Sequence, residues 1–389
     1  MLTYGTGTIA IRDENGQTTT QTWQAFGDPD DRRLTSLTDA NNQAWFYSYN
    51  ALGKLTGVGE PGGVSRAWSY DGRNLLASET HPESGTTSYG YDAVGNLLSK
   101  TDANGTGFSF SYDGNNRLTR VVAGGRETTI TYEPGSDNRQ TAYGPLVSST
   151  FVYDDAGRMK HRSDALDGRR IAADFSYDGN SNLTGITYTS GRHVRQDYDS
   201  ENRLVHVVDE TTGSDYAANF SYHPSGSVTS YQSGNGVVHS MTYDASRYWI
   251  RRIDAGDLHL AYDNYDGVGN VHSIGDSRSG MGQSFGYDAL DRLTSATGPY
   301  GSLAYTYDAL GNRTDAGNVY QNQRMVAQNG LSFGYDSNGN LQTGPNTSLS
   351  YTPDNLLEVA TIAGVATNYI YDIDTWRIRK ASSASVSYF

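Results

Sequence analysis

A seven-residue unit that begins with Tyr-Asp recurs throughout this chain. It reads Tyr-Asp-Ala-Val-Gly-Asn-Leu at Tyr91, and variants of it begin at Tyr49, Tyr287 and Tyr335. The first four units start 21 residues apart. A repeat of nearly fixed period constrains the fold more strongly than local propensity does, because every copy must adopt the same structure and pack on its neighbours. The sixteen tyrosines that begin a unit, called the anchor tyrosines below, are Tyr49, Tyr70, Tyr91, Tyr112, Tyr132, Tyr153, Tyr177, Tyr198, Tyr222, Tyr243, Tyr265, Tyr287, Tyr307, Tyr335, Tyr351 and Tyr371.

Each position of the unit suits a β-hairpin. Asp follows the anchor tyrosine in twelve of the sixteen units, Gly or Asn stands four residues after it in eleven, and Leu, Met or Val stands six residues after it in twelve. The Asp can accept hydrogen bonds from backbone amides of the turn, and the Gly or Asn supplies the left-handed residue that a type I turn with a bulge requires. An aromatic residue stands two positions before the anchor in eleven units, so both rings lie on one face of a strand.

Sixteen hairpins in phase predict an all-β protein that forms one long antiparallel sheet. Positive φ angles are expected at Gly95, Gly157 and Gly339, which hold the turn position that disfavours a Cβ atom. Rings that stand two residues apart, such as those of Phe110 and Tyr112, are expected to form ladders across successive repeats. Each cross-strand pair in such a ladder contributes roughly 0.2–1 kcal/mol.

This pattern closely resembles the YD-repeat, or RHS-repeat, family, whose units read Y-D-x-x-G-R/N-L-T. The segments Tyr91 to Leu98, Tyr112 to Thr119 and Tyr307 to Thr314 fit the motif, the last with Arg313 in place of the aliphatic residue, and the resemblance extends over residues 26–389. The family includes bacterial RHS proteins, the C components of insecticidal toxin complexes and animal teneurins. The resemblance implies a β-hairpin repeat sheet coiled into a spiral or partial hollow shell, which in the bacterial toxins encloses a C-terminal toxin domain.

The resemblance also implies a function. We expect a non-catalytic shell segment that encloses or presents another polypeptide, either a toxin domain or the remaining part of a longer RHS protein, in a secreted or cell-surface setting. Two alternatives stay open. Trp23, Trp45 and Trp68 recur at repeat-like spacing, so the chain can be read as an extracellular carbohydrate- or protein-binding module. A polysaccharide lyase or hydrolase is the other alternative, because a long β-scaffold with Tyr, His and Arg can host that chemistry.

The repeat also suggests the domain organisation. Residues 1–25 are expected to form N-terminal strands that pack on the repeat array, and residues 26–389 to form the shell of about 16 repeats, open-ended at its C-terminus. Phe26 to Leu34 reads as a degenerate first unit. The sequence stops at Ser385 to Phe389, where another unit is due, which indicates a fragment or a short relative whose last strand has an unpaired edge. Altered turns are expected after Tyr132, Tyr243 and Tyr351, where the sequence departs from the unit.

The dimensions of the strip limit what it can enclose. Two strands per unit give about 32 strands, and at roughly 4.8 Å per strand the strip is on the order of 150 Å long. Wound once, it forms a ring roughly 50 Å across and about 20 Å tall. A folded domain of 100 residues is roughly 34 Å in diameter. We therefore expect that this chain alone leaves both ends of such a guest exposed.

Composition argues against several classes of partner and chemistry. The chain has 29 Lys and Arg against 43 Asp and Glu, a net charge of −14, which argues against nucleic acid and anionic membrane surfaces. It has no cysteine, so disulfides, thiolate zinc sites and cysteine nucleophiles are excluded. No apolar run approaches the 18 residues of a membrane-spanning helix, and the N-terminus lacks the features of a signal peptide. The expected partner is a polypeptide, and a glycan is the alternative.

Short motifs with catalytic associations coincide with the repeat. G-x-S-x-G occurs at residues 282–286 and 330–334, each time one residue before an anchor tyrosine, whereas a nucleophile elbow needs a strand, a sharp turn and a helix. Residues 5–10 match a dinucleotide fingerprint but lack the βαβ unit around it. We interpret the two G-x-S-x-G matches as strand positions of the repeat, and we assign no nucleotide-binding role to residues 5–10.

Candidate metal ligands are equally weak. Asp266 and Asn270 resemble part of a calcium loop, but the twelve-residue ligand spacing is not met. None of the eight histidines has a partner four residues away, which a helical zinc site requires. We therefore expect no catalytic, cofactor-binding or metal-binding residues, and we assign the anchor tyrosines a structural role.

Overall fold

The protein is almost entirely antiparallel β-sheet, as the repeat predicts. The computed structural model describes residues 2–5, 7–25 and 31–389. The first 29 strands form one sheet in which each strand pairs with the next along the chain. These strands are β1 (Leu2–Gly5), β2 (Thr8–Arg12), β3 (Thr18–Ala25), β4 (Arg32–Thr38), β5 (Ala44–Tyr49), β6 (Leu55–Gly59), β7 (Ser65–Tyr70), β8 (Leu76–His81), β9 (Gly85–Tyr91), β10 (Leu97–Thr101), β11 (Gly107–Tyr112), β12 (Leu118–Ala123), β13 (Arg126–Tyr132), β14 (Arg139–Tyr143), β15 (Ser148–Tyr153), β16 (Met159–Leu166), β17 (Arg169–Tyr177), β18 (Leu183–Tyr188), β19 (His193–Tyr198), β20 (Leu204–Asp209), β21 (Ser214–Tyr222), β22 (Val228–Ser233), β23 (Val238–Tyr243), β24 (Ile250–Ala255), β25 (Leu258–Tyr265), β26 (Val271–Asp276), β27 (Gln283–Tyr287), β28 (Leu293–Gly298) and β29 (Gly301–Ala304).

The remaining strands form two shorter sheets of three and seven strands. The step between Tyr307 and Tyr335, which is longer than the repeat, holds the extra hairpin of β30 and β31, and the hydrogen-bonded sheet is interrupted there. Helical structure in the described residues is confined to two 3-10 turns, η1 (Pro61–Gly63) and η2 (Asp315–Gly317). The strands of the two shorter sheets are β30 (Val319–Gln321), β31 (Arg324–Gln328), β32 (Leu331–Ser332), β33 (Gly334–Tyr335), β34 (Leu341–Gly344), β35 (Thr347–Tyr351), β36 (Leu357–Ile362), β37 (Val365–Tyr371), β38 (Arg377–Ser382) and β39 (Val386–Tyr388).

The Tyr-Asp unit forms the predicted hairpin turn, which the copy at Tyr91 illustrates. Tyr91 ends β9 and faces Leu97, the first residue of β10. The amide of Asp92 donates to the carbonyl of Asn96 at 2.9 Å, and the amide of Gly95 donates to the carbonyl of Asp92 at 3.3 Å. The carboxylate of Asp92 accepts the amide of Asn96 at 2.8 Å. Register shifts by one residue just beyond the Tyr91–Leu97 pair, which is the expected bulge.

The fourth position after the anchor tyrosine has the predicted left-handed conformation. The φ angles of Gly95, Gly157 and Gly339 are 98°, 77° and 89°. Asn74 and Asn116, which replace Gly at this position, have φ of 65° and 62°. Gly or Asn is favoured here because a positive φ strains most residues with a Cβ atom.

Two of the three expected turn alterations are present. After Tyr132 and Tyr243 the loop is one residue longer, and the returning strand starts at Arg139 and at Ile250. The expectation at Tyr351 is wrong. Thr352 makes the usual turn there, because its hydroxyl accepts the amide of Leu356 at 3.0 Å in place of an Asp carboxylate.

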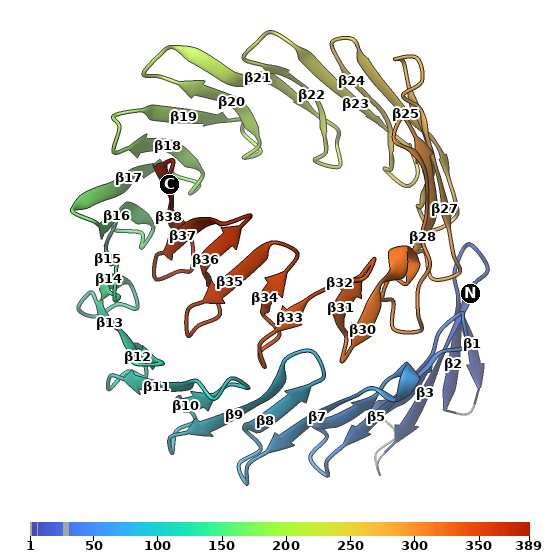
Figure 1. The fold of residues 1–389 in the computed structure, drawn as a ribbon. Coiled ribbons are helices and arrows are strands. Elements are labelled where there is room, and N and C mark those ends of the chain that lie inside the picture. The colour runs from blue at the N-terminus through green and yellow to red at the C-terminus, as the bar shows by residue number, and fades with distance from the viewer. Residues whose placement is uncertain (1, 6, 26–30) are drawn as a thin grey trace.

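The sheet winds through more than one full turn, and in the view of Figure 1 its last strands lie inside the ring that the earlier strands form. Hydrogen bonds between the two layers join residues 210 to 263 positions apart, from Arg162–Asp372 to Glu60–Gln323. Asn15, between β2 and β3, likewise bonds Asp266, between β25 and β26. We call the strands up to β25 the first winding and those from β26 to β39 the second winding.

This winding corrects the expectation that the strip forms a single ring. Because the turn after β2 meets the turn after β25, one winding takes about 23 strands, which measure on the order of 110 Å across the strands. The strands left over build a second layer instead of widening the ring. The single-band estimate failed because it did not consider that the two edges of the strip bind each other.

The ends of the chain continue the same pattern. β1 to β3 pair edge to edge with one another and with β4, as part of the first sheet. The expected first unit at residues 26–34 falls largely on residues 26–30, which lie outside the described part of the chain. β39 pairs with β38, and the amide of Phe389 donates to the carbonyl of Ile378 at 3.0 Å.

Candidate functional site: the seam between the windings

The two edges of the sheet are different surfaces. The motif rim is the row of turns that follow the anchor tyrosines, such as residues 50–54 and 92–96. The opposite rim is the row of turns that join one repeat to the next, such as residues 102–106 and 189–192. In the structure the motif rim of the second winding lies on opposite-rim turns of the first winding at Glu83 and Asn104, and it lies over strands β14 and β16 at Arg139 and Arg162. We call this whole contact the seam.

Within a winding, anchor tyrosines bind the preceding repeat through their hydroxyl groups. Tyr112, for example, donates to the carbonyl of Leu97 at 3.0 Å. The acceptor lies at or near the start of the preceding returning strand, so each bond ties two hairpins together. The thirteen such bonds that the structure shows, at 2.5 to 3.0 Å, come from Tyr49, Tyr70, Tyr112, Tyr132, Tyr177, Tyr198, Tyr222, Tyr243, Tyr265, Tyr287, Tyr307, Tyr335 and Tyr351.

Arginine at the fifth position after the anchor connects the turn to the next repeat. Arg117 pairs with Asp113 at 2.7 Å, and its guanidinium lies 4.5 Å from the ring centre of Tyr132. The amide of Arg117 and then its side chain lower the pKa of Asp113 by hydrogen bonding to the charged carboxylate. The same stacking on the next anchor recurs at Arg158, Arg203 and Arg292.

These contacts revise the predicted aromatic ladder. Stacked rings do cross β21 to β23, where Phe220 lies 5.3 Å from Tyr231 and Tyr231 lies 4.4 Å from His239. At many anchors, however, the neighbour over the ring is an arginine rather than a second aromatic residue. Phe110 is half-buried, so the expected buried column is not present at that site.

The seam begins with hydrogen bonds between turns. Asn104 on the opposite rim exchanges bonds with Asn338 on the motif rim, backbone amide to side-chain oxygen in both directions, at 3.0 and 3.3 Å. Its side-chain amide also donates to Asp336 at 3.0 Å. Arg324 donates to the carbonyl of Glu83 at 2.6 Å. The two windings are therefore joined by hydrogen bonds between side chains and backbone groups, like those within each turn.

The most buried part of the seam is an ion-pair cluster around Arg162. Arg162, on β16, lies 2.5 Å from Asp372 and 2.9 Å from Asp374, which belong to the turn between β37 and β38. Arg139, on β14, binds Asp374 from the other side at 2.8 Å. The ring of Phe151, which is 2 % exposed, lies 4.8 Å from the guanidinium of Arg139 and 5.4 Å from that of Arg162.

The two seam carboxylates shift in opposite directions. Burial raises the pKa of Asp372, and bonds from backbone amides and the charge of Arg162 offset this only in part. Burial also acts to raise the pKa of Asp374, but the hydrogen bond and charge of Arg139, together with Arg162, outweigh it and lower the pKa overall. Both carboxylates thus depend on arginines of the other winding for their charge.

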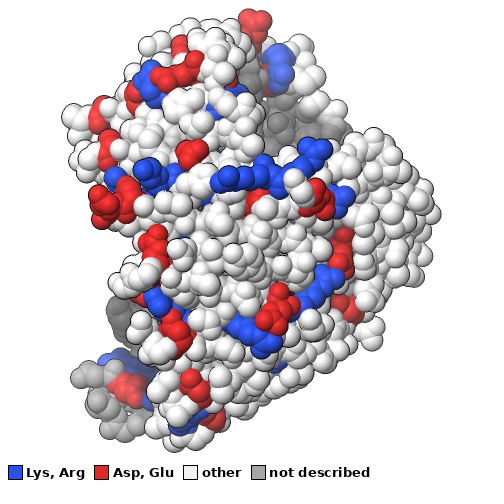
Figure 2. Space-filling model, turned by 90° about the vertical axis from the view of Figure 1, so that its left-hand side faces the viewer, with Lys and Arg blue, Asp and Glu red and all other residues white. Residues whose placement is uncertain are grey.

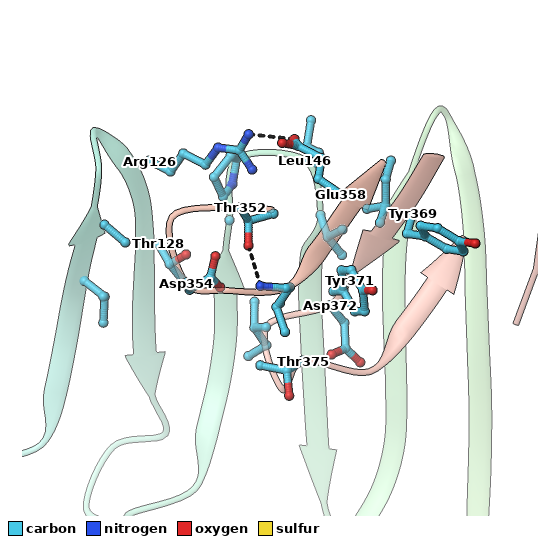
Figure 3. A pocket seen from close by; sticks show the side chains of 18 of the residues that line it. Arg126, Thr128, Leu146, Thr352, Asp354, Glu358, Tyr369, Tyr371, Asp372 and Thr375 are labelled. Carbon is cyan, nitrogen blue, oxygen red and sulfur yellow. Dashed lines mark hydrogen bonds and ion pairs between the residues drawn. The ribbon is translucent and has the colours of Figure 1, made fainter. Parts of the chain in front are cut away.

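A cavity of about 180 Å³ lies beside this cluster, between the two windings. Figure 3 shows that side chains of both windings point toward it. Arg126 of β13 closes one side by pairing with Glu358 of β36 at 2.6 Å. Apolar residues of both windings line much of it: Phe108, Val121, Ala123, Leu146, Val147, Leu356, Ile370 and Ile373.

On the face of the molecule that Figure 2 shows, acidic and basic side chains lie next to each other and do not form separate patches. Figure 2 shows Lys and Arg next to Asp and Glu in bands across this face, with uncharged residues between the bands. The Asp–Arg pairs of the turns, such as Asp154–Arg158 at 2.7 Å, account for this arrangement. The acidity of the chain therefore does not form one large patch on this side.

Most motifs that the sequence singled out take ordinary repeat positions. Ser284 and Ser332, the central residues of the two G-x-S-x-G matches, lie in strands β27 and β32. The carboxylate of Asp266 accepts the amides of its own turn and the side chain of Asn15, as expected of a turn aspartate. In the described part of the chain, no three His, Asp or Glu side chains are placed to hold a metal ion.

Fifteen of the sixteen anchor tyrosines are the last residue of a strand, and Tyr307 forms an isolated bridge with Arg313. Sequence reasoning did not find the seam residues Arg139, Arg162 and Asp372. Asp372 is the ordinary Asp of its unit, so its sequence context does not distinguish it from the other copies. It differs from them only because Arg162 of the first winding lies against it.

Comparisons with known proteins agree with this architecture. The RHS Repeat family model matches residues 27–65, 49–87, 70–106, 91–128, 153–193, 177–215 and 265–303, which together make up more than half of the chain. A search of curated proteins finds no match.

Solved structures of Tc toxin assemblies have a similar fold. The crystal structure of TcdB2-TccC3-TEV superimposes with a TM-score of 0.84 at 16% identity over 100% of this chain, and that of TcdB2-TccC3 with 0.81 at 17% over 98%. The Photorhabdus luminescens Tc holotoxin pore with a substituted TccC3 gives 0.74 at 16% over 96%. The chain spans about a quarter of the length of these proteins, since it covers 25%, 25% and 23% of them.

Proposed function

The chain belongs to the RHS-repeat family, and we propose on that premise that it is a shell segment that encloses or presents another polypeptide. The observation that carries the proposal is the seam. A sheet strip whose successive windings bind each other forms a wall of joined layers, which an enclosing shell requires. The Arg162 cluster and the Asn104–Asn338 contact are the bonds that close this wall.

The bore of the winding limits the guest. About 23 strands at roughly 4.8 Å, tilted by the roughly 35–45° that is typical of closed sheets, give a backbone diameter of roughly 45 Å. With about 5 Å of side chain on the inner face, the free bore is roughly 35 Å. A folded domain of 100 residues, roughly 34 Å in diameter, is close to this limit. The guest that suits this segment is a small domain or an extended chain, and we propose a toxin polypeptide because the structures of similar fold are toxin assemblies.

The proposal includes a secreted or cell-surface location, which the family resemblance implies. In the described residues, no helix is long and apolar enough to span a membrane. The carbohydrate alternative gains no support from two of the tryptophans that suggested it. Trp68 packs edge-on against His81 at 5.6 Å, and the indole N–H of Trp23 donates to Gln21 at 3.3 Å.

A protection assay tests enclosure. The C-terminus lies beside the first winding, where Tyr388 stacks 5.0 Å from Arg169 (Figure 1). An unstructured guest with protease sites, fused after Phe389, is expected to resist digestion in the wild-type shell. Arg162→Glu opens the seam and is expected to expose the guest, whereas Arg203→Glu, on the motif rim of the first winding, leaves it protected. Equal digestion of the guest in all three proteins contradicts enclosure.

A further inference from the structure

The motif rim of the first winding has the same sequence unit as the rim that forms the seam, yet nothing in the described structure lies on it. Leu52 and Val94, three residues after their anchors, are 70% and 74% exposed. The same position in the second winding holds Val268, Leu290 and Leu310, which are half-buried. The difference arises from the seam and not from the unit, because the turns have the same hydrogen bonds.

The seam shows what covers a motif rim. Leu290 lines a small pocket together with Asn41 and Gln43, which belong to an opposite-rim turn of the first winding. At Gly124, on another opposite-rim turn, a Cβ atom would lie 2.9 Å from the Pro353 ring, so the two rims approach as closely as glycine allows. The natural occupant of a motif rim is therefore an opposite rim.

The molecule also presents an uncovered opposite rim. The second winding covers the opposite-rim turns of the first winding as far as Asp167, which pairs with Arg379 at 3.2 Å. Beyond that contact the opposite rim continues through the second winding, where exposed apolar residues flank its turns. They are Leu331 at 53%, Ile362 at 58%, Val365 at 52% and Val386 at 51% exposed.

The two uncovered rims match in length. The motif rim is open along the first winding, and the opposite rim is open from β18 to β39, so each runs for about one turn of the spiral. Isolated apolar residues on a surface are ordinary, but here they lie on two rims that are complementary elsewhere in the same molecule.

We propose that a second copy of this chain docks head to tail, with the motif rim of one copy on the opposite rim of the other, so that the intramolecular seam continues between molecules. Such a contact is heterologous, because each copy contributes a different surface. It extends the wall by further layers, and it holds whether or not a guest is enclosed.

Complementing variants test this arrangement. A motif-rim variant carries Leu52→Asp and Val94→Asp, and an opposite-rim variant carries Ile362→Asp and Val365→Asp. A control carries Phe46→Asp and Val152→Asp, which change residues that are 62% and 46% exposed and lie within strands β5 and β15. Association is measured by sedimentation velocity over a concentration series, and circular dichroism verifies the fold of each protein.

Wild type and control are expected to associate with rising concentration, and each rim variant is expected to associate at least about tenfold more weakly, since a buried carboxylate costs more than 1.4 kcal/mol. A mixture of the two rim variants is expected to form a dimer, because each retains the rim that the other lacks. Three results overturn the proposal: wild type that stays monomeric throughout, a rim variant that associates like wild type, or a mixture that forms no dimer. The second result holds even if one variant is destabilised, because the other still reports. The mixture is made from variants that circular dichroism shows to be folded, so that absence of a dimer reports on the rims alone.

Discussion

Two stretches of the first winding, residues 102–166 and residues 183–255, are built from the same unit but differ in burial. The first lies under the second winding and contains Ala142, Ser149 and Phe151, each 2% exposed or less. The second has no layer above it, and its most buried side chains, Val208 and Asp209, are 8% and 5% exposed. The comparison shows that the unit builds the sheet, whereas stacking of windings builds the core.

The largest expected effect of a substitution is at Arg162. Arg162→Ala leaves the buried Asp372 without its arginine and the half-buried Asp374 with Arg139 alone, and loss of one partner of a buried ion pair costs about 3–5 kcal/mol. Native-state hydrogen exchange is expected to show this loss in β37 and β38. Arg203→Ala removes a half-buried pair with Asp199 at the uncovered rim and is expected to change local stability by about 0.2–1 kcal/mol. Similar effects of the two substitutions contradict the comparison.

Phe151 provides a second contrast. Phe151→Ala removes a ring that is 2% exposed and is expected to cost about 3–5 kcal/mol of unfolding free energy. Phe110 holds the same place in its unit but is half-buried, so Phe110→Ala is expected to cost about 1–2 kcal/mol. Chemical denaturation of both variants measures the difference. If Phe110→Ala costs as much as Phe151→Ala, the second winding adds nothing to the stability that the ring contributes, which contradicts the comparison.

The anchor hydroxyl is expected to have a smaller effect. Tyr112→Phe removes the bond to the carbonyl of Leu97 and is expected to cost about 0.5–1.5 kcal/mol. Tyr188 is not an anchor and is 43% exposed, so Tyr188→Phe serves as the control with little effect. Thermal unfolding of the two variants tests the hydroxyl ladder, and equal melting temperatures argue against it.

The smallest expected effect is a pH dependence in the uncovered stretch. The hydrogen bond to Asp215 raises the pKa of His206, against an opposing effect of burial and with a further contribution from Asp197. Stability from this group is present below the unfolded pKa of about 6.5 and is lost as pH rises through the higher folded value. His206→Gln is therefore expected to lower the melting temperature below pH 6.5 and to have little effect well above it. A deficit that grows with pH contradicts the assignment.

Asp374, in the seam, is expected to behave in the opposite way. Because Arg139 and Arg162 lower its pKa despite burial, its contribution is present above the unfolded value and is lost as pH falls through the folded one.

Much of the fold follows from local chemistry that the sequence displays. The position of Gly95 in its unit predicts its positive φ, and the spacing from Tyr91 to Leu97 predicts where one strand ends and the next begins. These features depend on the seven consecutive residues of one unit. Tyr351 shows the limit of the approach, because Thr352 performs the role of Asp through its hydroxyl.

The seam was not predictable from the unit. Arg162 and Asp372 are 210 positions apart, and their pairing depends on the curvature of the sheet, which sums small twists over about 23 strands. A small change in twist per strand changes which turns meet. The candidate functional site therefore depends on the curvature of the whole sheet, which local sequence patterns determine least.

A cross-link between windings tests the central claim most directly. The chain has no cysteine, so Asn104→Cys with Asn338→Cys introduces a single possible disulfide across the seam. Oxidation is expected to close a loop within one chain, visible as a shift in gel mobility that reduction reverses. The control pair, Asn202→Cys with Asn338→Cys, places one cysteine on the uncovered motif rim and is expected not to close. A stacked spiral predicts rapid closure of the seam pair alone, and failure of that pair to close, or equal closure of both pairs, contradicts it.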